Sequence, residues 1–388
     1  MALSKIDVAN MVTGATPIAN GGTGLTTNAL KPNSIPLVYN GNMEVSQRST
    51  SVTGLTNGSS GYHTLDRWKW HENGSPSSAW TMTQETLTSG NAYADGFNNA
   101  LKIDCTTAQG SLGAGDTLHI EQRFEKQDLG AFKKGTANAQ KFTFGFWVKA
   151  TKTGTNIIEL QDQGNDRAVS ATYTISTTNT WEHKVVTFPA DTTGNFGTSN
   201  ALGLIIRFYI FAGSNYTSSS LQTSWGTSST AARANGQVNN ADSTSNNWHL
   251  TGVQLEVGEY TSSTLPPFQH ESFGDNLARC QRYCQVYKTE SAYGMMSPAS
   301  VNSASAANGI FTFPTYLRAI PSLSTSGSFG LYSGDGGDAV SGIVIDANSD
   351  DASRVVCTIS GSGFTDNSAA FLRAENDSDA KMTFDAEL

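Results

Sequence analysis

Residues 141–149 read KFTFGFWVK, and this stretch decides the fold class. Phe142, Phe144, Phe146 and Val148 recur at every second position and would share one face of an extended strand. Period-two alternation of apolar side chains is typical of a β-strand with one buried face. The stretch therefore predicts a strand that packs this aromatic face into the core of a β protein.

Similar alternation extends outward along the chain on both sides of this stretch. In residues 117–124, Leu118 and Ile120 share one face with Phe124. Further strands are predicted at residues 66–72, 79–87, 99–105, 181–188, 202–211 and 253–257. About ten short strands with turn-rich connections are typical of a two-sheet sandwich. We therefore expect a jelly-roll-type β-sandwich over residues 35–270.

The composition agrees with an all-β chain that has long polar loops. Of the 388 residues, 37% are hydrophobic and 15% are charged, while Gly, Ser, Thr and Asn are abundant. Disordered chains lack aromatic residues, so an aromatic share of 10% excludes wholesale disorder. Scarce Glu, Lys and Arg together with abundant Thr and aromatic residues favour strands over helices.

Charge and hydropathy exclude two classes of partner. The formal net charge is -9 and the 24 basic residues are scattered, whereas nucleic-acid binding needs clustered Lys and Arg. No stretch approaches the roughly 20 apolar residues that span a bilayer, so membrane insertion is not expected. The start, MALSKIDVANMVTG, lacks the apolar core of a signal peptide. The four cysteines are predicted to be reduced and structural: Cys105, Cys280, Cys284 and Cys357.

Residues 1–34 are expected to form a short extended N-terminal arm. The segment is rich in Gly, Thr and Ala, which cannot build a core alone. Pro32 and Pro36 mark its boundary. Its sparse apolar side chains would suit docking onto a partner or onto sister chains: Leu3, Ile6, Val8, Met11, Val12 and Ile18.

A helical connector is predicted at residues 271–290. Ser272 and Asp275 have the spacing of a capping box, and Leu277, Cys280 and Cys284 would share one helix face. A second, smaller β domain is predicted at residues 291–388, because short apolar runs alternate there with turn clusters. These runs are residues 309–313, 341–346, 353–359, 369–373 and 380–384.

The sequence predicts neither a metal site nor a cofactor. Asp346, Asn348 and Asp350 match the opening of a calcium loop. Asp351 stands where that loop needs Gly, and Cys357 stands where it needs Glu, so a β-turn is the favoured interpretation.

Catalytic motifs are equally sparse. The chain contains no Gly-x-Ser-x-Gly elbow, no HExxH pair and no phosphate loop. Asp66, Glu256 and Asp346 are ordinary candidates for a glycosidase carboxylate pair, and none stands out. We therefore expect a protein that is not an enzyme.

Aromatic residues in polar loops point to sugar binding. A flat ring can stack on the apolar face of a sugar while neighbouring polar groups bind its hydroxyls. The candidates for glycan contact are Tyr93, Phe97, Tyr216 and Trp225. The alternative is that each ring anchors its own loop. Trp68, Trp147 and Trp248 lie in β-like runs and are predicted to be core residues.

Several runs together resemble bacteriophage tail fibre proteins. PIANGGTGLTT at residues 17–27 resembles a motif near the start of such fibres. NGNMEVSQRSTS at residues 40–51 and DRWKW at 66–70 resemble the opening of a tail-fibre sandwich module similar to carbohydrate-binding jelly rolls. Residues 251–287 resemble a junction in which a strand, an aromatic-Pro stretch and a short helix follow one another. FPTYLRAIPSL at 313–323 and the terminal FDAEL resemble the C-terminal domains of these proteins.

The resemblance implies a structural protein on the exterior of the virion, assembled as a homotrimer. Its N-terminal segment would attach to the phage tail or to another virion protein, and its distal domains would bind host surface polysaccharide or lipopolysaccharide without catalysis. The sequence departs from long fibres because it lacks a recognisable shaft. Two alternatives stay open: a head fibre, decoration or connector protein, and a glycan depolymerase spike.

Overall fold

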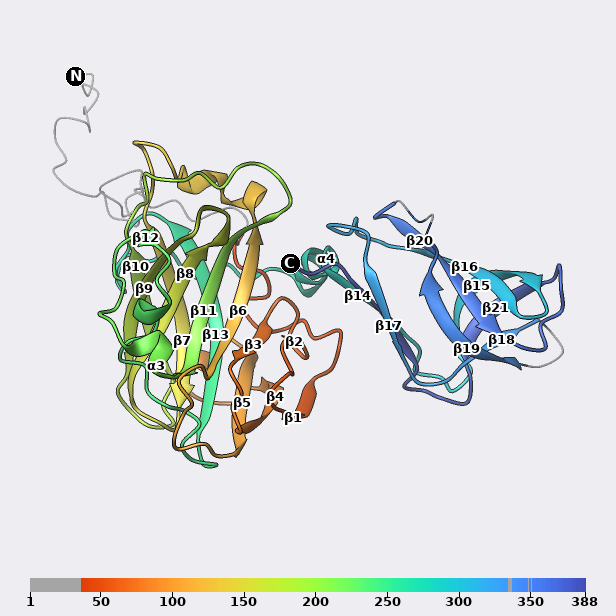
Figure 1. Ribbon diagram of the computed structural model, residues 1–388, viewed down its shortest axis with the longest axis horizontal. Coiled ribbons are helices and arrows are strands. Elements are labelled where there is room, and N and C mark those ends of the chain that lie inside the picture. The colour runs from red at the N-terminus through yellow and green to blue at the C-terminus, as the bar shows by residue number, and fades with distance from the viewer. Residues whose placement is uncertain (1–35, 334–336, 348, 350) are drawn as a thin grey trace, which may run out of the picture.

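The computed structural model describes residues 36–388 apart from 334–336, 348 and 350 (Figure 1). It confirms the all-β fold class. The expected arm at residues 1–34, with its docking residues, lies outside the described part. Figure 1 shows a β-sandwich and a smaller β-barrel side by side, with α4 between them.

Two antiparallel sheets form the sandwich. The first sheet contains, in spatial order, β1 (Ser51–Leu55), β4 (Ala79–Thr86), β5 (Asn99–Thr107), β13 (Asn247–Val257), β7 (Phe142–Ala150) and β10 (Glu182–Phe188). The second contains β12 (Gly226–Thr227), β9 (Arg167–Ile175), β8 (Gly154–Asp162), β11 (Leu202–Ala212), β6 (Thr117–Glu125), β3 (Lys69–Asn73) and β2 (Gly61–Tyr62). We call these the six-stranded and the seven-stranded sheet.

Short helices lie in the connections of the sandwich. These are α2 (Asn91–Ala94), α3 (Ser214–Thr217) and the 3-10 helices η2 (Lys126–Phe132), η3 (Gln163–Asn165) and η4 (Thr230–Ala232). None of the helices in the described part of the chain has the length and apolar character that a membrane span requires.

The aromatic face of β7 lies in the core between the sheets, as its alternation predicts. Phe142, Phe144, Phe146 and Val148 are all fully buried. The ring of Phe146 meets that of Phe208 edge-on, with centroids 5.2 Å apart. Burying large apolar side chains stabilises such a core by about 1.5–3 kcal/mol each.

The prediction that Trp147 belongs to the core was wrong. Trp68 and Trp248 are fully buried, but Trp147 is only half-buried and lies on the outer face of the six-stranded sheet. The physical reason is the alternation itself, because neighbouring residues of a strand point to opposite faces.

Helix α4 (Phe273–Gln281) follows the sandwich, and its start agrees with the predicted capping box. The hydroxyl of Ser272 accepts a hydrogen bond from the backbone N–H of Asp275 at 3.2 Å. Cys280 lies in this helix, but Cys284 opens strand β14 (Cys284–Lys288), because the helix ends at Gln281.

The C-terminal part contains a small sheet and a closed barrel. The sheet pairs β14 with β22 (Lys381–Asp385) and β22 with β17 (Ser322–Ser326). The barrel consists of β15 (Met295–Ser303), β16 (Ala306–Thr312), β20 (Arg354–Gly361), β19 (Gly337–Ile345), β18 (Phe329–Tyr332) and β21 (Ala369–Ala374).

Charged side chains join the C-terminal part to the sandwich. Arg48 Nη2 lies 2.9 Å from Asp385 Oδ2, and the buried Arg67 forms an ion pair with Glu387. Arg282 binds the buried Glu125 with two hydrogen bonds of 2.8 and 2.9 Å. The residues that follow β22 are therefore held against the sandwich.

Candidate functional site

A pocket of about 240 Å³ opens on the outer face of the six-stranded sheet. Its floor is formed by β7, β10 and β13, and its walls come from the β4–β5 connection and from the segment that follows β13. Its lining includes Asp95, Trp147, His183, Gln254, Ser262, Leu265 and Phe268. We call it the Trp147 pocket.

Two glycines allow the walls to close onto the sheet. A Cβ on Gly145 would lie 2.3 Å from Leu265 Cδ2, so a larger residue there would displace the Leu265 side chain. A Cβ on Gly252 would lie 2.6 Å from the ring of Phe97. Gly252 also has a φ of +61°, which favours glycine, and it lies within a bulge of β13.

The indole of Trp147 is held in a fixed orientation. Its Nε1–H donates a hydrogen bond to Asp95 Oδ2 at 3.0 Å. His183 is the cross-strand partner of Trp147 on β10, and the two ring centroids lie 5.1 Å apart at 47°. The side chain is only partly buried, and it lines the pocket.

The polar groups of the pocket are also fixed. Asp95 caps the C-terminal end of α2, where its backbone N–H donates to the carbonyl of Asn91 at 3.0 Å. Gln254 donates from Nε2 to the carbonyl of Pro266 at 2.9 Å. Burial lowers the pKa of His183, although Asp95 raises it, so the imidazole is neutral at pH 7.

Two of the four predicted aromatic residues lie near this pocket. Tyr93 is in α2, two residues before Asp95, and is 44% exposed. Phe97 is only 1% exposed and meets the ring of Phe268 edge-on, with centroids 4.9 Å apart. It therefore supports the wall of the pocket and offers no open face to a ligand in this conformation.

The other two predicted residues lie at a different place, where they anchor the long β11–β13 connection. Tyr216 packs against a small cluster that includes Ile157 and Tyr209 on the seven-stranded sheet. Trp225 donates from Nε1 to the carbonyl of Pro189 at 2.8 Å and packs against the sandwich core. The structure thus does not bring the four candidates together.

The β11–β13 connection is also held by charge. Buried Glu159 accepts two hydrogen bonds from Arg233, at 2.8 and 2.9 Å, and one from Arg207 at 3.1 Å. Burial alone would raise the pKa of Glu159, but the two arginines lower it to about 2. Glu159 is therefore ionised at neutral pH and anchors the connection to the sheet.

One group of possible metal ligands lies on the same sheet. The ligand atoms of His71, His119 and Glu121 all lie within 4.8 Å of one another. Glu121 already accepts hydrogen bonds from Arg207 at 3.1 Å and from Arg123 at 2.8 Å. Because both arginines already bind the Glu121 carboxylate, we assign these three residues to the ion-pair network of the sheet. Residues 348 and 350 of the calcium-loop pattern lie outside the described residues.

The three carboxylates considered for catalysis lie at separate places. Asp66 is fully buried and accepts hydrogen bonds from Gln47. Glu256 lies in β13 of the sandwich, and Asp346 follows β19 of the barrel.

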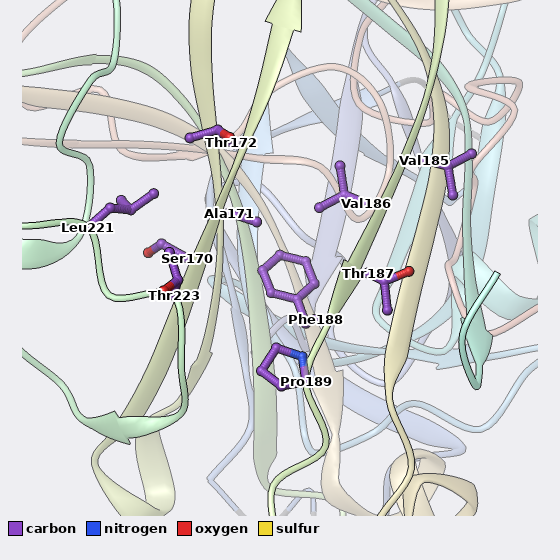
Figure 2. Close-up of a pocket in the computed structure, with 10 residues that line it drawn as sticks. All are labelled: Ser170, Ala171, Thr172, Val185, Val186, Thr187, Phe188, Pro189, Leu221 and Thr223. Carbon is purple, nitrogen blue, oxygen red and sulfur yellow. The ribbon is translucent and has the colours of Figure 1, made fainter. Parts of the chain in front are cut away.

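A second pocket, of about 360 Å³, lies where the edges of the two sheets meet (Figure 2). Figure 2 shows its lining from β9, β10 and the β11–β13 connection, with Phe188 and Pro189 at its centre. None of the ten residues labelled there carries a charge. The Trp147 pocket is therefore the stronger candidate, because it combines an accessible aromatic ring with converging polar groups.

Sequence reasoning missed Trp147, although the signal was present. The alternation that places Phe146 inside also places Trp147 outside, next to a glycine that admits a covering loop. Asp95, His183 and Gln254 had no comparable local signal, because they come from three separate segments of the chain.

No protein-family model matches the chain, and no curated protein matches it either. Among solved structures, the chain is similar to the enzymatically active domain of tailspike protein 4 from bacteriophage CBA120. The identity is 14% and the TM-score 0.30, over 57% of this chain and 21% of that one. It is also similar to a protein from Bacteroides thetaiotaomicron VPI-5482 that is provisionally assigned as sugar binding. There the identity is 12% and the TM-score 0.32, over 57% of this chain and 100% of that one.

A third similar structure is TmCBM61 in complex with β-1,4-galactotriose. The identity is 10% and the TM-score 0.26, over 58% of this chain and 99% of that one. Similarities this low carry no conclusion about what this chain binds.

Proposed function

We propose that this protein is a phage tail fibre that binds a glycan of the host cell surface in the Trp147 pocket and does not cleave it. The observation that carries the proposal is the partly exposed indole of Trp147, held in place among polar side chains. Such a combination of one flat apolar face and a few converging polar groups is what a sugar ring requires.

The dimensions of the pocket suit a small part of a glycan. Sites for drug-sized ligands enclose roughly 300–1,000 Å³, and this pocket encloses about 240 Å³. One sugar ring at the end or at a branch of a polysaccharide would stack on Trp147. Its hydroxyls would then reach Asp95, Gln254 and Ser262.

The single carboxylate among the described lining residues favours binding over cleavage. Asp95 is the one carboxylate among the described residues that line it. Most glycoside hydrolases use two carboxyl groups about 5–10 Å apart. A depolymerase that used this pocket would need a second carboxylate from elsewhere.

The role in a phage particle is supported by the sequence motifs alone. We propose that residues 1–34 attach the protein to the phage tail or to another virion protein, and that the fibre is a homotrimer on the exterior of the virion. Deleting residues 1–34 should leave a folded, soluble protein that no longer joins particles. A deletion variant that still assembles onto particles would show that the attachment lies elsewhere.

Binding of the full chain to purified surface polysaccharides and lipopolysaccharides of candidate hosts tests glycan recognition. Trp147→Ala should weaken binding to the glycan recognised by about fivefold or more, because stacking of a flat ring such as a nucleic-acid base on an aromatic side chain contributes about 1–3 kcal/mol. Phe273→Ala is the matched control, since it removes a 57% exposed aromatic residue from α4. Equal binding by Trp147→Ala and the parent, at equal melting temperature, would overturn the proposal.

A further inference from the structure

We infer that the Trp147 pocket selects uncharged sugars and rejects acidic ones such as uronic acids and sialic acids. This inference rests on the proposed function, because it names the class of glycan that the same pocket binds. Three features of the described residues carry it: the charge of the lining, its hydrogen-bonding groups and its rigidity.

The lining carries one formal charge, and that charge is negative. Asp95 supplies it, while His183 is neutral at pH 7 because burial lowers its pKa. Lys149, the nearest lysine along β7, does not neutralise the charge of Asp95. Lys149 Nζ lies over the ring of Trp181, 5.1 Å from its centroid, and 3.9 Å from Glu85 Oε2.

Asp95 favours a ligand that donates hydrogen bonds. An ionised carboxylate only accepts, and Trp147 uses one of about four lone-pair positions on Asp95. The indole has a single N–H, which already donates its hydrogen bond to Asp95. Gln254 donates a hydrogen bond from its side-chain amide to the carbonyl of Pro266. Sugar hydroxyls can donate to Asp95, whereas the carboxylate of an acidic sugar finds no cationic donor among the described lining residues.

The carboxylate of Asp95 cannot easily move away from an anion. The turn that carries it is closed by backbone hydrogen bonds from Gly96 to Tyr93 at 3.0 Å and from Phe97 to Ala92 at 3.2 Å. Phe97 anchors this turn, because its ring is buried in a small apolar cluster with Leu87, Ala100 and Trp181. Two like charges held at a few ångströms repel one another, and a fixed loop cannot relieve this repulsion.

Matched glycan pairs test the inference with the full-length protein. The probes are oligosaccharides that end in glucose, galactose, mannose or their N-acetylated amino sugars, each compared with its uronic acid at low ionic strength. The parent protein should bind the preferred neutral probe at least tenfold more tightly than its acidic counterpart, which corresponds to about 1.4 kcal/mol.

Asp95→Asn should reduce this preference severalfold and weaken binding of the neutral probe. Asparagine removes the charge but keeps an oxygen that accepts the Trp147 hydrogen bond, so the wall of the pocket should stay intact. Asp166→Asn is the matched control. It removes the same charge from an exposed turn in the other sheet, at a φ of 50° that asparagine tolerates.

The outcomes separate the inference from the proposed function. If the parent binds an acidic probe as tightly as its neutral partner, or if Asp95→Asn keeps the full preference, the inference is overturned while glycan binding stands. If the parent binds no probe and no host polysaccharide, the proposed function falls and the inference falls with it.

Discussion

The ammonium group of Lys134 is fully buried and is surrounded by oxygen atoms. Its Nζ lies 2.7 Å from Asp162 Oδ2 and 3.1 Å from Asp191 Oδ2. It also donates to the carbonyls of Thr193 at 3.0 Å and Gly194 at 2.6 Å. A buried charge with this many partners fixes the loops around it, because removing it leaves the buried Asp162 without its cation, while Asp191 keeps Arg167.

Lys134→Met should therefore destabilise the sandwich by about 3–5 kcal/mol, which is typical of a broken buried ion pair. Urea unfolding of the variant and the parent measures this difference. Lys141→Met is the control, since Lys141 pairs with Glu259 on the surface and such pairs contribute about 0–1 kcal/mol. Similar losses in the two variants would contradict the account of Lys134.

Burial of His119 makes the sandwich sensitive to mild acid. Burial lowers the pKa of His119 from 6.5 to about 3, although Glu121 opposes the shift. Between these two values the unfolded chain binds a proton that the folded chain does not bind. The stabilisation is therefore complete above about pH 6.5 and is lost progressively as the pH falls toward 3.

The free energy of unfolding should fall by about 2 kcal/mol between pH 6.5 and pH 5 through His119 alone. His119→Gln should remove this part of the pH dependence, as denaturant unfolding at both pH values would report. His270→Gln, at an exposed position, should keep the slope of the parent. If His119→Gln also keeps that slope, acid sensitivity arises from other groups.

Local pattern predicts single residues well where one face of a strand is buried. Phe142, Phe144 and Phe146 could be placed in the core because alternation alone decides their face. Trp147 was misplaced because lying in a β-like run does not by itself decide which face of the strand a side chain occupies. Phe97 could not be placed, because its burial depends on a loop folding over Gly252.

At the scale of elements, the β11–β13 connection is a fixed cover of the seven-stranded sheet. Arg233 joins it to the buried carboxylate of Glu159 through two hydrogen bonds, and Tyr216 packs beneath it. A charge-assisted bidentate pair of this kind is among the stronger polar contacts in proteins.

Arg233→Ala should release this cover without unfolding the sheets, because Arg207 still neutralises Glu159. Hydrogen exchange should become at least tenfold faster in residues 214–235 and stay unchanged in β6 and β11. Arg354→Ala is the control, since its pair with Asp351 is 3.9 Å long and exposed. Unchanged exchange in residues 214–235 would show that apolar contacts alone hold the connection.

The same cover explains why the sequence failed to predict β8. Most strands of the sandwich could be predicted, but β1, β2, β8, β9 and β12 could not. Ile157 and Ile158 are adjacent in β8 and both are fully buried, because the cover shields the outer face as well. A strand buried on both faces loses its alternation and cannot be recognised by period.

At the scale of the whole molecule, the residues after β22 connect the C-terminal part to the sandwich. Glu387 pairs with Arg67, whose side chain is fully buried and whose guanidinium carbon lies 3.4 Å from the ring centroid of Tyr283. Such pairing between residues 320 positions apart leaves no local signal, so the sequence could not predict it. The predicted helix at the junction did have such a signal in Ser272.

Glu387→Gln should weaken this connection by leaving the charge of Arg67 buried with less compensation. Calorimetry should then resolve two unfolding transitions, one for the sandwich and one for the C-terminal part, where the parent unfolds more cooperatively. Asp379→Asn is the control, because Asp379 is exposed and pairs with Lys288 on the surface. A single transition at an unchanged temperature in Glu387→Gln would contradict this role.

The central claim is that a sugar ring binds on Trp147, and a crystal structure of the complex tests it most directly. The full-length protein would be crystallised with the neutral oligosaccharide that binds most tightly. The account predicts one sugar ring against the indole of Trp147, with a hydroxyl within hydrogen-bonding distance of Asp95. Sugar bound only elsewhere, for example on the exposed Tyr293 of the barrel side, would contradict it.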